Sequence, residues 1–182
     1  MGIPGAALLP VLLLAVSSFQ ACDPPPPPDP GASPWDAPPQ VEAELLEVIQ
    51  DLFDVIEHRD TELGRRVLHP GGRFLSIRET EEGTVVREQS HDEFLTSIAR
   101  EGPAFLERFW DPEILYRGDL AVVWTPYDFW VDGERSHCGV DAFTLVRGDD
   151  GWRIAATVYT VEVTGCDDAP LRSPLGLPEW DE

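Results

Sequence analysis

The 182-residue sequence contains no lysine, so all 13 of its basic side chains are arginines, against 34 Asp and Glu and a formal net charge of −21. No basic stripe is available to neutralise phosphates, and nucleic acid is therefore not expected as a partner. The same charge opposes binding to an anionic lipid surface except through an attached lipid. The ordinary effect of such an acidic excess is solubility.

Motifs of the common catalytic and cofactor sites are also missing. The sequence has no phosphate-binding Gly-rich loop, no nucleophile elbow, no HExxH and no CxxC. We therefore expect no cofactor and no metal site of these known types. Any catalytic chemistry therefore has to come from residues that belong to none of these motifs.

A long hydrophobic run is lacking as well. The apolar stretch at the N-terminus extends only from Ala6 to Val16, too short to span a membrane but typical of a signal-peptide core. The segment Phe19-Gln20-Ala21-Cys22 resembles a bacterial lipobox, in which the cysteine is lipidated after cleavage. We expect a signal peptide over residues 1–21 and a lipoprotein anchored through Cys22 to a membrane of the bacterial cell envelope. A soluble secreted or periplasmic protein is the alternative.

Proline sets the boundaries of the folded part. Residues 22–39 include the stretch DPPPPPDPGASPWDAPP, which stays extended and suits a tether between a lipid anchor and a domain. Residues 167–182 contain three prolines and no periodicity, which predicts a loose tail. Residues 40–166 remain, enough for one domain with a single core.

Helical periodicity marks the first part of this domain. Residues 41–59 predict an amphipathic helix, and a shorter helix is expected over 61–68. Ser90 and Glu93 form a capping box that opens a third helix ending near Arg100. The apolar positions at helical spacing in the first helix are Leu45, Val48, Leu52, Val55 and Ile56.

Strand signals occupy the remaining segments. Residues 73–78 and 84–89 predict a hairpin, and Asp132-Gly133 is a strong hairpin turn later in the chain. The predicted order is α-α-β-β-α-β-β-β-β, an α+β domain. The last four strands are expected, as an antiparallel meander, over residues 109–116, 120–131, 136–147 and 152–163.

Three short stretches carry a family resemblance: residues 118–123 (GDLAVV), Asp132-Gly133, and residues 151–154 (GWRI). With the element order, they resemble the nuclear-transport-factor-like superfamily, which includes ketosteroid isomerases and polyketide cyclases. The stretch SHCGVDAF, residues 136–143, is most similar to the branch described as putative lumazine-binding. The resemblance covers residues 40–166 and implies a cone-shaped fold of three helices on a curved, mainly antiparallel sheet. It implies little about activity.

The stretch SHCGVDAF places a His, a Cys and an Asp close together in sequence. On a strand, His137 and Cys138 point to opposite faces, so they cannot form a dyad. His137 and Asp141 share a face, but their backbones are ~13 Å apart. The stretch is therefore not a catalytic cluster by itself.

Neighbouring strands can complete a site. A two-residue turn at Asp132-Gly133 pairs Asp128 with His137 and Trp124 with Asp141, unless Pro126 forms a bulge that turns Asp128 and Trp124 to the other face. A four-residue loop over 148–151 pairs Glu162 with His137. The predicted ligand-binding residues of a partly apolar pocket are Trp110, Trp124, Asp128, His137, Asp141, Thr160 and Glu162.

Between two carboxylates, the pKa of His137 should rise, which would make it a cation or an acid–base group. There are two alternatives. Asp128, His137 and Glu162 could bind a divalent metal, or His137 could simply be a paired histidine at a sheet edge. Asp141 against Trp124 would stay protonated and donate a hydrogen bond, or else be tied to an Arg or a backbone amide.

Cys138 and Cys166 remain as an even pair if Cys22 is lipidated, which favours a disulfide in an exported protein. The strand register disfavours it, because Cys166 would lie ~16 Å beyond the partner of Cys138. A bridge requires the chain to fold back after Thr164-Gly165.

Three functions are therefore open. The first is a binding domain for a small apolar or aromatic molecule, and the second is an isomerase, dehydratase or cyclase using His137 or Asp141. The third is a dimerisation or interaction module. Its outer sheet face would present Cys138, Val140, Ala142, Val146, Tyr159 and Val161.

Overall fold

The computed structural model describes residues 33–166. The predicted signal peptide, Cys22, most of the tether and the tail over 167–182 lie outside the described residues. In the part that is described, no helix is both long enough and apolar enough to cross a membrane.

The expected α+β fold is confirmed, with helices and a curved sheet in the predicted order. The segment predicted as one strand over 109–116 is split in two at Asp111, whose φ is +46°. The elements are α1 (Pro39–His58), α2 (Thr61–Val67), β1 (Leu68–Thr80), β2 (Gly83–Ser90), α3 (His91–Ile98), β3 (Phe105–Phe109), β4 (Glu113–Arg117), β5 (Leu120–Val131), β6 (Glu134–Gly148) and β7 (Gly151–Thr160).

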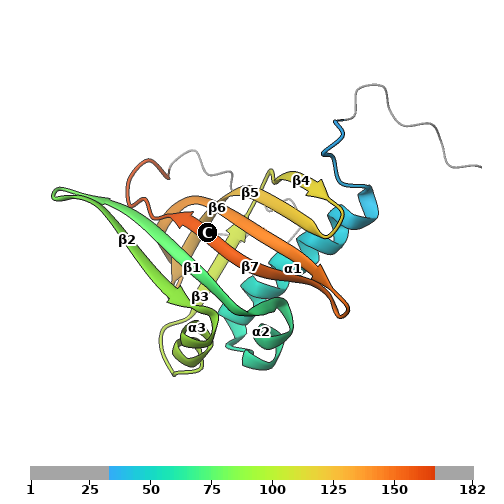
Figure 1. Ribbon diagram of the computed structural model, residues 1–182. Helices are drawn as coiled ribbons and strands as arrows, with labels where there is room; N and C mark the ends of the chain where they lie inside the picture. Colours follow the sequence, from blue (N-terminus) through green and yellow to red (C-terminus); the bar gives the residue numbers. More distant parts are fainter. Residues whose placement is uncertain (1–32, 167–182) are drawn as a thin grey trace, which may run out of the picture. The chain divides into compact units, whose positions relative to one another are not determined.

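One mixed sheet contains all seven strands. Its order is β2-β1-β7-β6-β5-β3, and β4 pairs with the other part of the β5 edge. The β1–β7 pairing is parallel, and every other pairing is antiparallel. Figure 1 shows the sheet curving around the helices, with α1 running behind it and α2 and α3 below. The sheet therefore has an inner face toward the helices and an outer face.

Helix α1 supplies much of the core. It begins at Pro39, where a missing N–H costs nothing, and ends at His58, after which Arg59 caps it in the left-handed conformation. Phe53 meets Phe109 of β3 edge-on, with ring centroids 5.5 Å apart. The buried residues of α1 are Leu45, Ile49, Leu52, Phe53, Val55 and Ile56.

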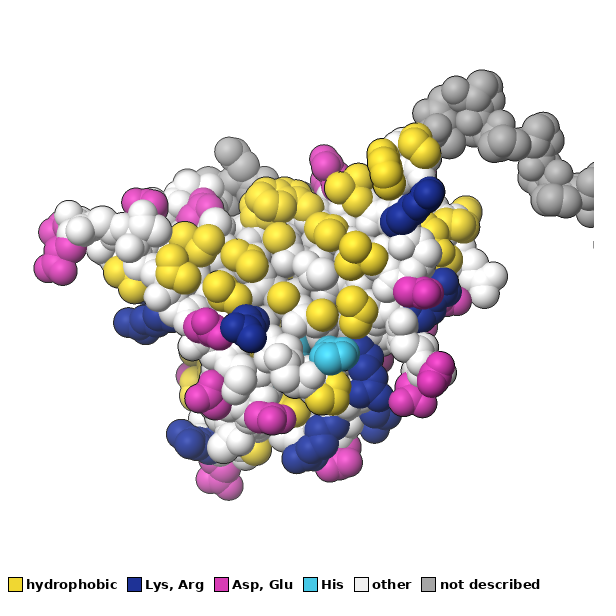
Figure 2. All heavy atoms as spheres, viewed as in Figure 1, with side chains coloured by type: hydrophobic (Ala, Val, Ile, Leu, Met, Phe, Trp, Pro, Cys, Tyr) yellow, Lys and Arg dark blue, Asp and Glu magenta, His cyan; other side chains and the backbone are white. Residues whose placement is uncertain are grey.

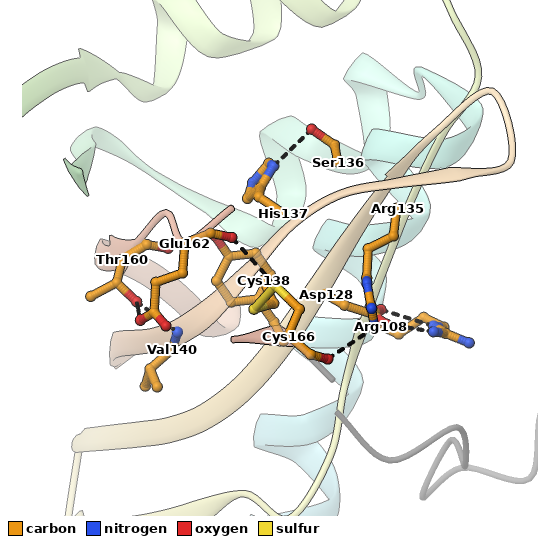
Figure 3. Close-up of a disulfide and its surroundings, with 11 residues drawn as sticks. Arg108, Asp128, Arg135, Ser136, His137, Cys138, Val140, Thr160, Glu162 and Cys166 are labelled. Atoms are coloured by element: carbon orange, nitrogen blue, oxygen red, sulfur yellow. Dashed lines mark hydrogen bonds and ion pairs between the residues drawn. A yellow bond between two sulfur atoms is a disulfide. The ribbon is translucent and has the colours of Figure 1, made fainter. Parts of the chain in front are cut away.

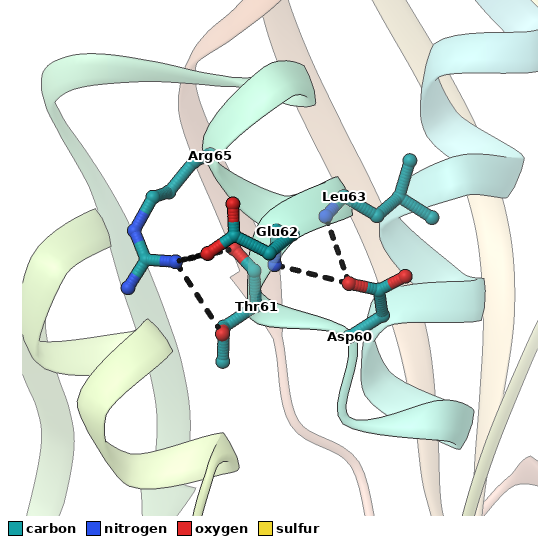
Figure 4. A network of polar contacts seen from close by, with 5 residues as sticks. All are labelled: Asp60, Thr61, Glu62, Leu63 and Arg65. Atoms are coloured by element: carbon teal, nitrogen blue, oxygen red, sulfur yellow. Dashed lines mark hydrogen bonds and ion pairs between the residues drawn. The ribbon is translucent and has the colours of Figure 1, made fainter.

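Both short helices begin at side-chain caps. The Asp60 carboxylate accepts hydrogen bonds from the backbone N–H groups of Glu62 and Leu63, at 3.0 and 2.9 Å (Figure 4). At α3 the predicted capping box is present, with Ser90 and Glu93 bonding reciprocally. Such caps satisfy N–H groups that a helix leaves unpaired, and they fix where α2 and α3 meet the sheet.

The register of the meander is correct at the turns but wrong beyond them. Val131 pairs with Glu134 as predicted, but a bulge at Ser136 then shifts β5 against β6 by one residue. A second bulge, at Ala155, shifts β6 against β7. Because side chains alternate, each shift moves the predicted partners to the opposite face. Pro126, where a bulge was the alternative to the predicted register, lies inside a regular ladder.

Cys138 and Cys166 form a disulfide, with their Cα atoms 5.7 Å apart. The distance expected from a continuous strand is wrong, because β7 ends at Thr160 and the chain folds back. Glu162 still pairs with Cys138, and Gly165 adopts φ +80°. Figure 3 shows the bridge on the opposite side of β6 from His137.

The last residues before α1 contact the domain. The Trp35 carbonyl accepts a hydrogen bond from the Tyr116 amide at 2.8 Å, and the Arg117 guanidinium lies 5.7 Å from the centroid of a Trp35 ring. The chain segment from Ser33 is therefore attached to the edge of the sheet at β4.

Candidate functional site

A cavity of about 280 Å³ lies between the helices and the inner face of the sheet. Helices α1 and α3 form one wall, and strands β1, β2, β3, β5, β6 and β7 form the other. The lining residues are Leu52, Phe53, Ile56, Phe74, Gln89, Phe94, Ser97, Ile98, Phe105, Glu107, Tyr127, Phe129, His137, Asp141, Phe143, Thr157 and Tyr159. Most of this lining is aromatic or aliphatic, and the polar groups come mainly from the sheet.

Asp141 is the most unusual polar group of the lining. Only 2% of the residue is exposed, and its Oδ2 atom has no hydrogen-bond partner among the described residues. Burial raises the pKa of this carboxyl well above its ordinary value. The nearby Thr157 hydroxyl is also buried and unpaired. The Asp141 carboxyl therefore keeps its proton to a higher pH than an exposed carboxyl does.

Glu107 is a second carboxyl in the same cavity. It lies on β3 opposite Phe129, on the inner face of the sheet. Although the residue as a whole is only partly buried, desolvation is the main cause that raises its pKa well above the ordinary value, followed by the charges of Asp141 and Asp128. Two nearby carboxyls in a desolvated site cannot both be ionised easily, so the pair retains protons at pH values where exposed carboxyls are charged.

His137 lines the cavity as an uncharged imidazole. Its ring stacks on Phe129 with centroids 5.0 Å apart, and its Nδ1 lies 3.1 Å from the Ser136 hydroxyl. Burial, and secondarily the charge of Arg78, lower the pKa of His137. The expected rise is wrong, because the bulges place neither Asp128 nor Glu162 opposite this ring.

Two tyrosines complete the polar part of the cavity. The Tyr127 hydroxyl donates a hydrogen bond to the Thr160 carbonyl at 2.6 Å, and Tyr159 pairs with Asp141 across β6 and β7. Burial, followed by nearby carboxylates, raises the pKa of both phenols. Both are therefore neutral hydroxyls at physiological pH.

The remaining predicted site residues lie elsewhere. Asp128 is on the outer face, where Arg108 donates two hydrogen bonds to it at 2.9 and 2.5 Å. Trp124 is 52% exposed on that same face. The Trp110 side chain is buried away from the cavity lining. The predicted pairings of Asp128 with His137 and of Trp124 with Asp141 are therefore wrong, and a one-residue shift is the reason.

The other two predicted residues lie where the chain leaves β7. The Thr160 hydroxyl accepts a hydrogen bond from the Val140 amide at 3.0 Å and donates one to the Glu162 carboxylate (Figure 3). Neither residue lines the cavity. Over residues 33–166, no group of three or more His, Cys, Asp or Glu side chains is placed to hold a metal ion.

Sequence reasoning missed Glu107, Tyr127, Phe129 and Tyr159. Glu107 was missed because the strand was expected to begin at residue 109. The alternation of Phe105, Glu107 and Phe109 is a period-two signal that could have revealed β3. The other three residues were assigned to the wrong face, or to none, by the shifted register.

A more open groove of about 720 Å³ leads to the cavity. It lies between the β1–β2 hairpin and α3, and it shares Phe74, Gln89, Ser97 and Tyr159 with the cavity. The Gln89 amide donates a hydrogen bond to the Ser97 hydroxyl at 3.4 Å across this neck. The four shared residues form the neck between the groove and the cavity.

Sequence comparison relates residues 40–160 to a protein family described as "Putative lumazine-binding". This match spans nearly the whole folded domain. No curated protein matches the chain.

Several solved structures share the fold at low sequence identity. An NTF2-like superfamily protein from Salmonella enterica has a TM-score of 0.55 and 19% identity, covering 72% of this chain and 98% of its own. A Nostoc punctiforme protein of unknown function with a cystatin-like fold has a TM-score of 0.55 and 11% identity, covering 70% and 95%. A putative dehydratase of the NTF2-like family from Streptomyces avermitilis has a TM-score of 0.52 and 18% identity, covering 68% and 98%. At these identities the likeness establishes the cone-shaped fold alone.

Proposed function

The chain belongs to the family described as "Putative lumazine-binding", and on that premise we propose that its domain binds a small, flat, partly apolar molecule in the cavity. The observation that carries this proposal is the buried, unpaired Asp141 carboxyl in a cavity with aromatic walls. Leaving a buried polar atom unpaired costs roughly 1–3 kcal/mol, which a ligand hydrogen bond would recover.

The size and lining of the cavity support a small ligand. Its volume is close to the lower end of the roughly 300–1,000 Å³ typical of ligand pockets. Aromatic rings from α3 and from the sheet, among them Phe94, Phe105 and Phe129, would contact a flat molecule. Apolar walls with a few polar groups are the usual composition of such sites.

Native mass spectrometry of the purified domain for co-purifying small molecules tests this proposal. Ser97 is exposed at the neck, so Ser97→Trp should block entry without disturbing the core. Thr96→Trp is the matched control, since Thr96 lines only the outer groove. We expect a bound molecule, or binding of added lumazine, in the wild type and Thr96→Trp but not in Ser97→Trp. Equal retention in all three would contradict the cavity as the site.

We also propose that the protein is exported and anchored through a lipidated Cys22. The disulfide between Cys138 and Cys166 supports export, because such bridges persist in oxidising compartments. A lipid anchor with more than one chain would hold the domain stably at a membrane. Mass spectrometry of the membrane-derived protein should find an acylated Cys22, and Cys22→Ser should release the protein. An unmodified residue 22 would refute the anchor.

The outer sheet face supports a homodimer. Figure 2 shows hydrophobic side chains gathered over this face, and Leu115, Leu120 and Trp124 are 60, 48 and 52% exposed. Three residues expected on this surface are not available, since Tyr159 lines the cavity, Cys138 is in the disulfide and Val161 is buried. We expect light scattering to show a dimer that Trp124→Glu converts to a monomer. A monomeric wild type would refute this assembly.

An isomerase, dehydratase or cyclase activity is the second candidate. The observation that favours it is one cavity lined by a neutral imidazole and by two carboxyls with raised pKa values, which could supply a base and an acid. If the cavity is catalytic, a molecule that co-purifies with His137→Gln should differ chemically from one that co-purifies with the wild type. The same molecule in both would favour binding alone.

A further inference from the structure

We propose that the cavity selects an organic cation, namely a protonated amine or amidine on a flat apolar body, with its N–H groups donating to Asp141 and Glu107. This inference rests on the proposed function and names the chemical class of its ligand.

The ionisable side chains that line the cavity itself favour a positive ligand. The ionisable side chains of the lining are Glu107, Asp141, His137 and two tyrosines, and no arginine lines it among the described residues. His137 is neutral and does not repel a cation, and Tyr127 and Tyr159 are neutral hydroxyls.

Charged groups of both signs lie behind the lining. Asp128, behind Glu107, is paired with Arg108, and Glu162 adds a further negative charge near Tyr127. Arg78 on β1 is the positive group whose charge reaches His137 and Tyr159. Among residues 33–166, however, no arginine lines the cavity itself, so the position that a ligand cation would take is not filled by a side-chain cation.

The unpaired atoms match the donors of such a ligand. Asp141 Oδ2 and Thr157 Oγ1 are both buried, and neither has a hydrogen-bond partner among residues 33–166. A carboxylate accepts several hydrogen bonds, and an ammonium or amidinium group offers several N–H donors. One cationic group on the ligand would donate hydrogen bonds to both atoms and would also pair with the negative charge of the Asp141 carboxylate.

The aromatic walls supply a second attraction. Rings attract a cation placed over their faces within about 6 Å, and this attraction grows when the cation is desolvated. The cavity is lined by rings from α1, α3 and the sheet, including Phe53, Phe94 and Phe129. An enclosed carboxyl with aromatic rings around it is chemically suited to a cation and gains less from a neutral ligand.

Binding of a cation should release protons from the cavity, whereas binding of a neutral ligand should release none. Without ligand, the raised pKa values keep a proton on the Asp141 and Glu107 pair. When the cation binds, a carboxyl loses its proton to solvent, and the resulting carboxylate faces the ligand's positive charge. One proton is therefore released for each carboxyl that ionises. A neutral ligand that accepts a hydrogen bond from the protonated acid releases none.

Benzamidine and benzamide are nearly the same size and shape, but only benzamidine is cationic, so they are suitable probes. Calorimetry of the full domain at pH 7, in phosphate and in Tris buffer, should show benzamidine binding about tenfold more tightly or better. The measured heat of benzamidine binding should differ between the two buffers, because each buffer takes up the released protons with a different ionisation enthalpy. Benzamide should show no buffer dependence.

Variants assign the effect to the cavity. Asp141→Asn should reduce benzamidine affinity to that of benzamide and abolish most of the proton release. Glu81→Gln removes one exposed charge far from the cavity and should change neither quantity beyond a small uniform effect. This control separates a local carboxyl from the general field of the acidic chain.

Each remaining outcome decides the inference. Equal or tighter binding of benzamide, or binding of benzamidine without proton release, would overturn it and leave small-molecule binding intact. Failure of both probes to bind would also overturn it. The co-purification experiment with Ser97→Trp makes no assumption about charge, so it decides separately whether the cavity binds small molecules at all.

Discussion

Phe129 lies directly opposite His137 on the neighbouring strand, and the two rings stack with their centroids 5.0 Å apart and an angle of 24° between their planes. This contact exists because the bulge at Ser136 shifts β6 by one residue. It replaces the ion pair that a regular hairpin would give His137. The imidazole is therefore enclosed by aromatic rings, with no carboxylate opposite it.

The first prediction concerns the protonation of His137. Burial disfavours the charged ring, and Arg78 adds to this effect, so the pKa of His137 should lie below 6.5. NMR titration of the ring resonances should place the midpoint below that value. Arg78→Gln should raise it, because one cause of the lowering is removed. A midpoint above 6.5 would mean that a carboxylate contacts the ring.

The second prediction concerns stability against pH. Folding raises the pKa of Asp141 and Glu107, so the folded state holds protons that the unfolded state releases. Their contribution is complete below the unfolded value of about 4 and falls as the pH rises toward the raised folded values. Urea unfolding from pH 4 to 8 should show a shallower loss of stability in Asp141→Asn than in the wild type. A steeper loss in the variant would contradict a protonated Asp141.

The third prediction concerns the disulfide. The bridge joins residues 28 apart in sequence, and closing a loop of this length contributes roughly 3–4 kcal/mol to the free energy of unfolding. A reducing agent should lower the urea midpoint of the wild type accordingly. The double variant Cys138→Ala, Cys166→Ala should be insensitive to reductant. An equal response of both proteins would show that the bridge does not form.

The fourth prediction concerns Gly139, on β6 between His137 and Asp141. A Cβ atom there would lie 2.4 Å from the Thr160 carbonyl oxygen, which also accepts the Tyr127 hydrogen bond. Gly139→Ala should destabilise the domain by roughly 1–3 kcal/mol, because backbone atoms have to move. Gly148→Ala on the same strand is the control, since nothing lies within 4 Å of its Cβ position. Equal stability of the two variants would contradict this packing.

The fold could be predicted from hydrophobic periodicity and from cap and turn residues, which are signals local in the sequence. The spacing of Leu45, Leu52 and Ile56 predicted α1, and Ser90 with Glu93 predicted the start of α3. The hairpin at Asp132-Gly133 was also correct. These signals are local because caps and turns are formed by neighbouring residues.

The composition of the site did not follow, because it depends on register over many residues. One extra residue at Ser136 and another at Ala155 shift the pairing of β5 with β6 and of β6 with β7 by one residue each. Each shift places the predicted partner residues on the opposite face of the sheet. His137 and Asp141 were still found in the cavity because they share one strand, whose alternation the bulges do not interrupt between them. Asp128, Trp124 and Glu162 depended on pairing across strands and were displaced.

The central claim is that a small molecule enters the cavity on the inner face of the sheet. NMR shift mapping of the labelled domain with lumazine, benzamidine and benzamide, each added separately, tests it most directly. We predict that at least one of them moves the backbone amide resonances of Glu107, His137 and Asp141 and leaves those of Leu115 and Trp124 unchanged. Shifts confined to the outer-face residues, or no shift with any of the three, would contradict the account.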